Sequence, residues 1–144
     1  QWKQQDFTAR LAPTPQDLEA FLAPLVTAGI DAFHCSQRRF WEPEFEGSDL
    51  NLAGWVKKLT GMPTITVGSV SLDQDFITQP AEGDGAASEP ASIDRLLEMM
   101  DRGDFDLVAV GRALIANADC PKVVRSGDTS GLHAYSRDML ASLD

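Results

Sequence analysis

Short apolar runs alternate with amphipathic segments along this sequence, and the alternation restricts the folds that it can form. Three runs read as strands, at residues 30–36, 64–70 and 106–110, and a segment with helical spacing of its apolar residues precedes each of them. Strands separated by helices are typical of a parallel sheet with right-handed crossovers. The sequence therefore predicts an α/β fold, with successive strands roughly 30 to 40 residues apart.

Capping residues and apolar spacing predict where the helices begin and end. Thr14 and Pro15 are typical of a helix start and Gly29 of a helix end, whereas Pro24 should kink or divide the helix between them. Further helices are expected at 50–59, from Ser92 to Gly103 with Ile93, Leu96, Leu97 and Met100 buried, in patches over 114–124, and at about 132–143.

Composition and charge exclude several classes of partner. The 144 residues fall within the range of one domain, and the formal net charge of −10 argues against nucleic acid or an anionic membrane as a partner. The sequence has no apolar run long enough for a membrane span, and its first residues lack the apolar stretch expected of a signal peptide. Cys35 and Cys120 have no metal-ligand spacing and fit free thiols in a reducing cytoplasm, which is the expected location.

The segment 105–117 joins an expected buried strand directly to a glycine, an arginine and a helix start. Leu107 to Val110 is a short apolar run, as expected for a strand that is covered on both faces. Gly111 allows close approach of the backbone to a ligand, and Arg112 supplies a charged, forked donor. Free N–H groups at the start of a helix favour anions. The pattern indicates a phosphate site, or else a tight turn with a solvated arginine.

A second strand ends in a similar way, at Gly68 and Ser69. The carboxyl ends of parallel strands lie on one rim of the sheet, where ligands bind. Gly68 and Ser69 would supply backbone N–H groups there, and Gly111 and Arg112 would complete a phosphate pocket. The alternative is that both glycines are turn residues.

The loop at 37–49 contains paired arginines beside aromatic residues, which a simple linker does not need. In one interpretation, Phe40 or Trp41 lies over a ligand while Arg38 or Arg39 contacts an anionic group of a substrate or cofactor. In the other, the loop is solvated and an aromatic ring packs against the body of the domain.

Histidine and cysteine do not suggest catalysis here. His34 alternates with Phe33 and Cys35 along a strand, so we expect it to be a core or helix-facing residue. Cys35 is interpreted as packing, because no base lies near it in the sequence, and His133 is expected at the surface. The acidic residues have no calcium-loop spacing, so neither a catalytic residue nor a metal site is predicted.

Three segments resemble the last three strands of the Old Yellow Enzyme family. They are 31–36 (DAFHCS), 63–70 (PTITVGSV) and 106–119 (DLVAVGRALIANAD), and the strand-Gly-Arg-x-Leu-small-Asn-x-Asp pattern of the third is the most specific. The family comprises flavin-dependent NAD(P)H oxidoreductases, which include ene-reductases. The resemblance extends over most of the chain from Trp2 onward, apart from a Gly- and Pro-rich stretch at 78–90 that we interpret as a flexible insertion.

The resemblance implies a (β/α)8 barrel that carries one FMN, with NADH or NADPH as reductant and an activated alkene, such as an α,β-unsaturated carbonyl compound, as small-molecule substrate. Gly68, Ser69, Gly111 and Arg112 would then bind the FMN phosphate. The loop with Arg38, Arg39, Phe40 and Trp41 would lie over the substrate pocket.

The sequence departs from the family in length, since a full barrel needs at least ~200 residues. It resembles strands six to eight only, and it opens without a methionine, so we expect a piece of a longer chain. Tyr135, the only tyrosine, is expected in the last helix and does not match the family's proton donor. The chain alone should therefore be inactive, and it should associate with the rest of a barrel or with a second copy. Two alternatives remain open: another phosphate-binding barrel enzyme, and an inactive half-barrel that only associates.

Overall fold

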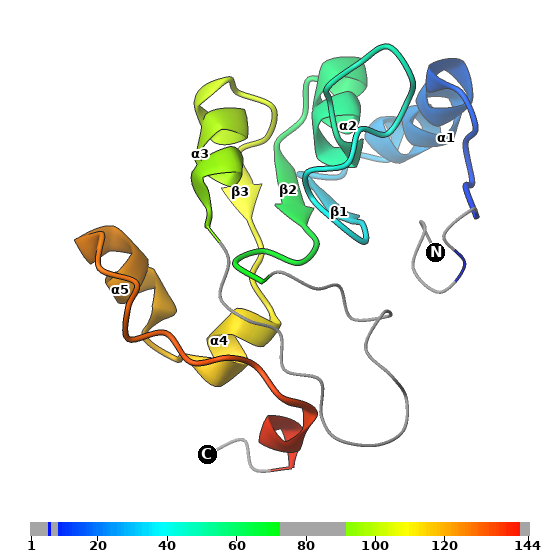
Figure 1. The fold of residues 1–144 in the computed structure, drawn as a ribbon. Coiled ribbons are helices and arrows are strands. Elements are labelled where there is room, and N and C mark those ends of the chain that lie inside the picture. Colours follow the sequence, from blue (N-terminus) through cyan, green and yellow to red (C-terminus); the bar gives the residue numbers. More distant parts are fainter. Residues whose placement is uncertain (1–5, 7–8, 73–91, 142–144) are drawn as a thin grey trace. The chain divides into compact units, whose positions relative to one another are not determined.

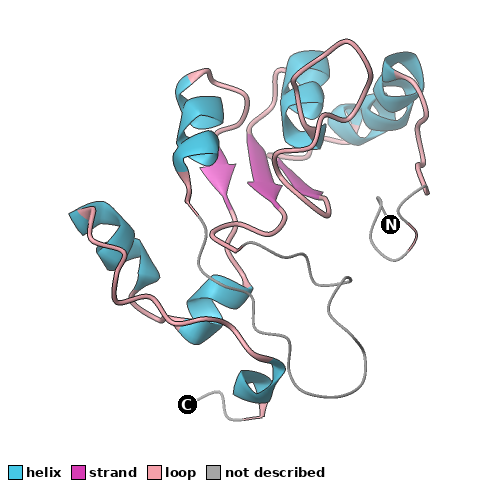
Figure 2. Ribbon diagram, in the orientation of Figure 1, coloured by secondary structure: helices cyan, strands magenta, loops and turns pink. Residues whose placement is uncertain are grey.

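The computed structural model describes residues 6, 9–72 and 92–141, so the insertion predicted at 78–90 lies outside the described residues. The chain divides into two compact units. The first comprises residues 1–68 and 94–109, and the second comprises residues 69–93 and 110–144. The prediction of an α/β fold is confirmed, because helices alternate with the strands of a parallel sheet (Figures 1 and 2).

The first unit holds the sheet, whose three strands lie in the order β1-β2-β3. Both strand pairs are parallel: Phe33 is paired with Thr64 across β1 and β2, and Ile65 with Leu107 across β2 and β3. The strands are shorter than predicted, because only some residues of each predicted strand form hydrogen bonds with a neighbouring strand. In chain order the elements of this unit are α1 (Pro15–Thr27), β1 (Phe33–Ser36), α2 (Leu52–Thr60), β2 (Thr64–Val67), α3 (Asp94–Asp101) and β3 (Leu107–Val108).

The two faces of the sheet differ in burial. Cys35, Thr64 and Thr66 are buried on one face, and α2 packs against β1 and β2. On the other face, His34 is exposed and Leu107 is 57% exposed, and these two residues flank Ile65 in the register. The predictions that His34 is a core or helix-facing residue and that the 107–110 strand is covered on both faces are therefore wrong. The described residues cover the sheet on one face only.

Helix α1 begins as its sequence predicts. Thr14 and Asp17 form a reciprocal capping box, in which the Asp17 N–H donates to Thr14 Oγ1 and the Thr14 N–H donates to Asp17 Oδ2, both at 3.2 Å. Pro24 lies inside the helix without dividing it, and its carbonyl accepts a hydrogen bond from the Ala28 N–H. Gly29, with φ +84°, follows the helix as predicted.

Asn51 connects α2 to the loop that precedes it and to the sheet. Its Oδ1 caps the helix by accepting from the Gly54 N–H at 2.9 Å. Its Nδ2 donates to the Phe40 carbonyl at 2.8 Å and to Thr66 Oγ1 at 3.1 Å. The side chain is fully buried, so these bonds replace the water that it loses on folding.

Helix α3 presents a different face to the interior than its sequence predicts. Leu96 and Met99 are buried, whereas Leu97 is 47% exposed and Met100 is 39% exposed. The helix has only eight residues, and Leu96 and Met99 are separated by one turn, so they define a narrow buried face. Gly103, with φ +81°, follows the helix as predicted.

The second unit is built from short helices around Tyr135. It contains α4 (Arg112–Ala116), α5 (Cys120–Ser126) and the 3-10 helix η1 (Arg137–Leu140). Leu72, Ala113 and Tyr135 form its buried cluster. The helix predicted at 132–143 is wrong over most of its length, because among the described residues 132–141 only Arg137–Leu140 is helical, and Tyr135 precedes it. None of the helices in the described ranges is long and apolar enough to cross a bilayer.

Candidate anion-binding site

Ser69 and Arg112 lie together in the second unit, although 42 residues separate them in the chain. Arg112 Nη2 is 3.4 Å from Ser69 Oγ, and the contact is partly buried. Ser69 follows β2 after one glycine, and Arg112 is the first residue of α4, after β3. The pairing brings a hydroxyl and a guanidinium, both hydrogen-bond donors, to one place, which is the donor set that a phosphate monoester accepts from.

The backbone around Ser69 has an unusual conformation for residues with a side chain. Ser69 has φ +50° and Ser71 has φ +61°. Residues other than glycine seldom adopt positive φ, at a cost of order 1–3 kcal/mol each, and such positions cluster at ligand sites. The turn is closed by a hydrogen bond of 3.2 Å from the Leu72 N–H to the Ser69 carbonyl. A strained serine turn beside an arginine was not apparent from the sequence.

The ring of Tyr135 makes a cation–π contact with Arg112. The guanidinium carbon of Arg112 is 5.7 Å from the centre of the Tyr135 ring, and the ring is 1% exposed. A cation over an aromatic face is attracted by the ring, which helps to hold the guanidinium in place. The sequence does not predict this role, because an isolated tyrosine in an expected helix carries no signal for a contact with Arg112.

Asn117 anchors the segment that carries Tyr135. Its Nδ2 donates to the His133 carbonyl at 3.0 Å, and its Oδ1 accepts from the His133 N–H at 2.7 Å. The Asn117 side-chain amide thus forms the same pair of hydrogen bonds with the His133 backbone that a neighbouring β-strand would form. Asn117 belongs to the motif at 106–119 that carries the family resemblance, and it acts here by holding the loop before Tyr135 in place.

The two glycines of the predicted phosphate pocket have different surroundings. Gly68 belongs to the first unit, has φ +145°, and a Cβ built on it would lie 2.5 Å from the Gln37 carbonyl oxygen. Glycine is therefore required there by the backbone of the neighbouring loop. Gly111 belongs to the second unit and caps α4 with φ −105° and ψ −96°. Because α4 has five residues, Ser69 and Arg112 carry the site and the helix dipole adds little.

The loop at 37–49 is held in place by contacts within the first unit. Phe40 is 4% exposed and Phe45 is 7% exposed, so both rings pack into the interior of the unit. Trp41 is partly buried and meets the Phe40 ring edge-on at 5.1 Å, and Arg39 forms an ion pair of 3.1 Å with Glu42. Of Phe40 and Trp41, the two candidates for a ring that faces a ligand, only Trp41 has a substantial solvent-exposed surface.

The two cysteine side chains are buried, whereas His133 lies at the surface. Cys35 is buried and unpaired, and burial raises the pKa of its thiol to about 12, which opposes nucleophilic chemistry. Cys120 is also buried and unpaired, whereas His133 is exposed as predicted. Within the described ranges, no group of three or more His, Cys, Asp or Glu side chains is arranged to hold a metal ion.

Neither a protein-family model nor a curated protein matches this sequence.

Proposed function

We propose that this chain is the phosphate-binding, C-terminal part of an FMN-dependent NAD(P)H oxidoreductase of the Old Yellow Enzyme type, which reduces activated alkenes. The contact between Ser69 Oγ and Arg112 Nη2 carries the proposal, because it joins the two segments that the family motif assigns to the FMN phosphate. The resemblance to the last three strands of that family's (β/α)8 barrel agrees with three parallel strands in sequential order.

The residues present fit a phosphate monoester. Arg112 offers a guanidinium supported by Tyr135, and Ser69 offers a hydroxyl in a turn with positive φ. When bound, FMN would supply hydride transfer between a nicotinamide and an alkene. The part of this chain would be to fix the cofactor by its phosphate, and no residue of the chain is assigned to the chemistry.

The sheet face that no described residue of the first unit covers supports the view that the unit is part of a larger assembly. In a closed barrel the inner face of every strand is packed by its neighbours, whereas here Leu107 is 57% exposed. The same observation favours a second candidate, an inactive half-barrel that associates through this face. The two candidates differ in whether the chain binds FMN.

Titration with FMN, followed by flavin absorbance and fluorescence, tests the proposal. We expect Arg112→Ala to weaken FMN binding by about 10- to 100-fold, because a charge-assisted hydrogen bond contributes about 1.5–3 kcal/mol. The FMN affinity of the Arg112→Lys variant should lie between those of the unsubstituted chain and Arg112→Ala. Lysine keeps the positive charge but lacks the two parallel N–H donors of the guanidinium.

Arg125→Ala is the matched control, because Arg125 is an exposed arginine near the end of α5 in the same unit. It should bind FMN as the unsubstituted chain does. Equal affinity of the Arg112→Ala and Arg125→Ala variants would contradict the phosphate site. A chain that takes up no FMN but forms a stable oligomer would favour the associating half-barrel instead.

A further inference from the structure

The contact between Ser69 and Arg112 joins two segments of the second unit, and a third segment packs against both of them. Tyr135 belongs to this third segment and is 1% exposed. It forms one buried cluster with Leu72, whose N–H closes the Ser69 turn, and with Ala113. Ala113 directly follows Arg112 in α4. The position of Ser69 relative to Arg112 therefore depends on a side chain that is too buried to contact a ligand.

Tyr135 also contacts Arg112 directly, through the face of its ring. The guanidinium carbon lies 5.7 Å from the ring centre, which is within the distance of about 6 Å at which a cation is attracted by an aromatic face. An arginine side chain is long and has many rotamers, so the entropy that it loses when it is immobilised opposes the binding of an anion. A ring that already holds the guanidinium reduces this entropic cost.

Asn117 connects the segment that carries Tyr135 to the helix that carries Arg112. Its Nδ2 donates to the Ala113 carbonyl of α4 at 3.2 Å and to the His133 carbonyl at 3.0 Å. Asn117 is 8% exposed, so these hydrogen bonds are shielded from water. The Tyr135 ring, two residues after His133, is therefore held near Arg112 by backbone hydrogen bonds as well as by packing.

We propose that Tyr135 is a positioning residue of the anion site, which holds the Arg112 guanidinium beside Ser69 before an anion binds. The inference rests on the proposed phosphate site and adds that its affinity depends on the aromatic ring of Tyr135. The ring makes the contact with the guanidinium, so the hydroxyl group is dispensable. Removing the ring should weaken phosphate binding even though Arg112 and Ser69 are both still present.

Titration of the full chain with FMN and with inorganic phosphate measures the effect on binding. Tyr135→Leu should weaken the binding of both ligands about three- to tenfold, because it removes a partly buried cation–π contact. Tyr135→Phe keeps the ring, so both affinities should stay within about twofold of those of the unsubstituted chain. In the Arg112→Ala background, Tyr135→Leu should have no further effect, because the ring acts through Arg112.

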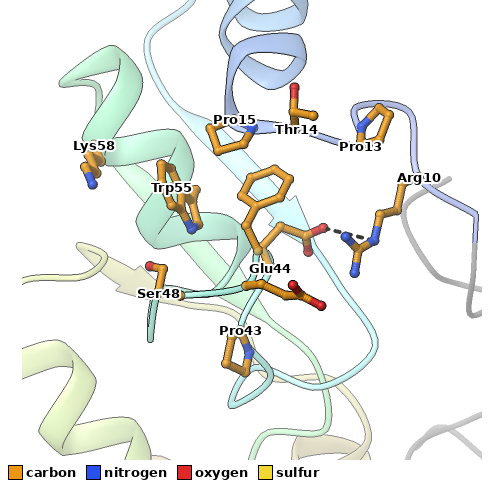
Figure 3. A pocket seen from close by; sticks show the side chains of 12 residues that line it. Arg10, Pro13, Thr14, Pro15, Pro43, Glu44, Ser48, Trp55 and Lys58 are labelled. Carbon is orange, nitrogen blue, oxygen red and sulfur yellow. Dashed lines mark ion pairs between the residues drawn. The ribbon is translucent and has the colours of Figure 1, made fainter.

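Trp55→Leu is the matched control, because it also removes an aromatic ring that contacts a cation. Lys58 Nζ lies 4.5 Å from the centre of the Trp55 ring, and both residues line a groove in the first unit (Figure 3). This substitution should leave the affinities for FMN and for inorganic phosphate unchanged.

Nuclear spin relaxation of the Arg112 ¹⁵Nε tests the same inference without ligand and without a change at Tyr135. The signal is identified by its absence from the spectrum of the Arg112→Lys variant. We expect an order parameter above about 0.6 for Arg112 in the ligand-free chain, and one below about 0.6 for the exposed Arg125.

Three results would overturn the inference: Tyr135→Leu binds inorganic phosphate as the unsubstituted chain does, Tyr135→Leu weakens binding equally with and without Arg112, or Arg112 is as mobile as Arg125. A chain that binds inorganic phosphate but not FMN would contradict the proposed function alone. The role of Tyr135 would then still be supported by weaker phosphate binding in Tyr135→Leu and its recovery in Tyr135→Phe.

Discussion

Gly68 has a backbone conformation and a packing environment that fit glycine alone. Its φ is +145°, and a Cβ would meet the Gln37 carbonyl oxygen at 2.5 Å and the Arg38 carbonyl oxygen at 3.1 Å. Both neighbours are backbone atoms, which cannot move aside as a flexible side chain does. The end of β2 can therefore approach the 37–38 loop only because the residue there is glycine.

The variant Gly68→Ala should lower the free energy of unfolding by about 2–4 kcal/mol, which is the range of overpacking combined with an unfavourable φ. Gly61→Ala is the control, because Gly61 also has positive φ, +67°, but open space around its Cβ position. It should cost about 1–2 kcal/mol. Urea unfolding of both variants measures the difference, and equal losses would show that the contact with the 37–38 backbone has no cost.

Cys35 should be chemically inert in the folded chain. Cys35 is 5% exposed, and burial raises the pKa of its thiol to about 12, so almost no thiolate forms at neutral pH. Burial also raises the pKa of Cys120, with a smaller contribution from Asp119. We expect both thiols to react with Ellman's reagent far more slowly in the native chain than in denaturant. Rapid native labelling of Cys35, resolved with a Cys120→Ser variant, would contradict this burial.

At the scale of elements, Asn51 connects α2 to the loop that precedes it and to β2. One side chain caps the helix, holds the Phe40 carbonyl and contacts Thr66 of β2. Replacing it with alanine should cost about 2–4 kcal/mol, because a cap and buried bonds are lost together. Thr14→Ala, which removes only the cap of α1, should cost about 1 kcal/mol. Thermal unfolding compares the two, and similar losses would contradict the connecting role of Asn51.

A pH-dependent contact links α2 to the start of β3. The pKa of Asp106 is lowered, first by the hydrogen bond from Lys57 Nζ at 2.8 Å and then by the bond from the Thr64 N–H at 2.9 Å. A lowered pKa in the folded state means that this stabilisation is present above the ordinary value of 3.8 and is lost as the pH falls through the folded value.

The Asp106→Asn variant should be less stable than the unsubstituted chain at pH 7 by about 0.5–1 kcal/mol, a value kept small because the Asp106 side chain is 40% exposed. The difference should vanish at pH values below the folded pKa. Urea unfolding at a series of pH values checks this, and a difference that stays constant from pH 7 to pH 2 would contradict the account.

Much of the order of elements could be predicted from the sequence, because capping signals act locally. Thr14 precedes α1 and Gly29 follows it in the structure, as the sequence predicts. The burial of individual side chains could not be predicted as well, because it depends on which other segments of the chain pack against them. Leu107 and His34 occupy a sheet face that nothing described covers, and Phe40 is buried by a loop whose path depends on Asn51. The site residue Arg112 could be identified from its motif, whereas the contact between Arg112 and the Tyr135 ring could not.

For the whole molecule, the sheet face that the described residues of the first unit leave uncovered predicts association. Leu107 lies in β3 at one edge of the sheet and exposes 57% of its surface, and unpaired edges and apolar faces promote contact between chains. Sedimentation should show a mass that rises with concentration, and Leu107→Glu should shift it toward the monomer. Leu140→Glu, at a leucine 47% exposed in the second unit, is the control. A monomer at every concentration would contradict this prediction.

The central claim is that Ser69 and Arg112 bind the phosphate of a flavin nucleotide, and a comparison of FMN with riboflavin tests it most directly. The two ligands share the ring and differ in the phosphate. We predict that FMN binds, that riboflavin binds at least about tenfold more weakly, and that inorganic phosphate competes with FMN. Riboflavin binding as tightly as FMN, with no competition from phosphate, would contradict it.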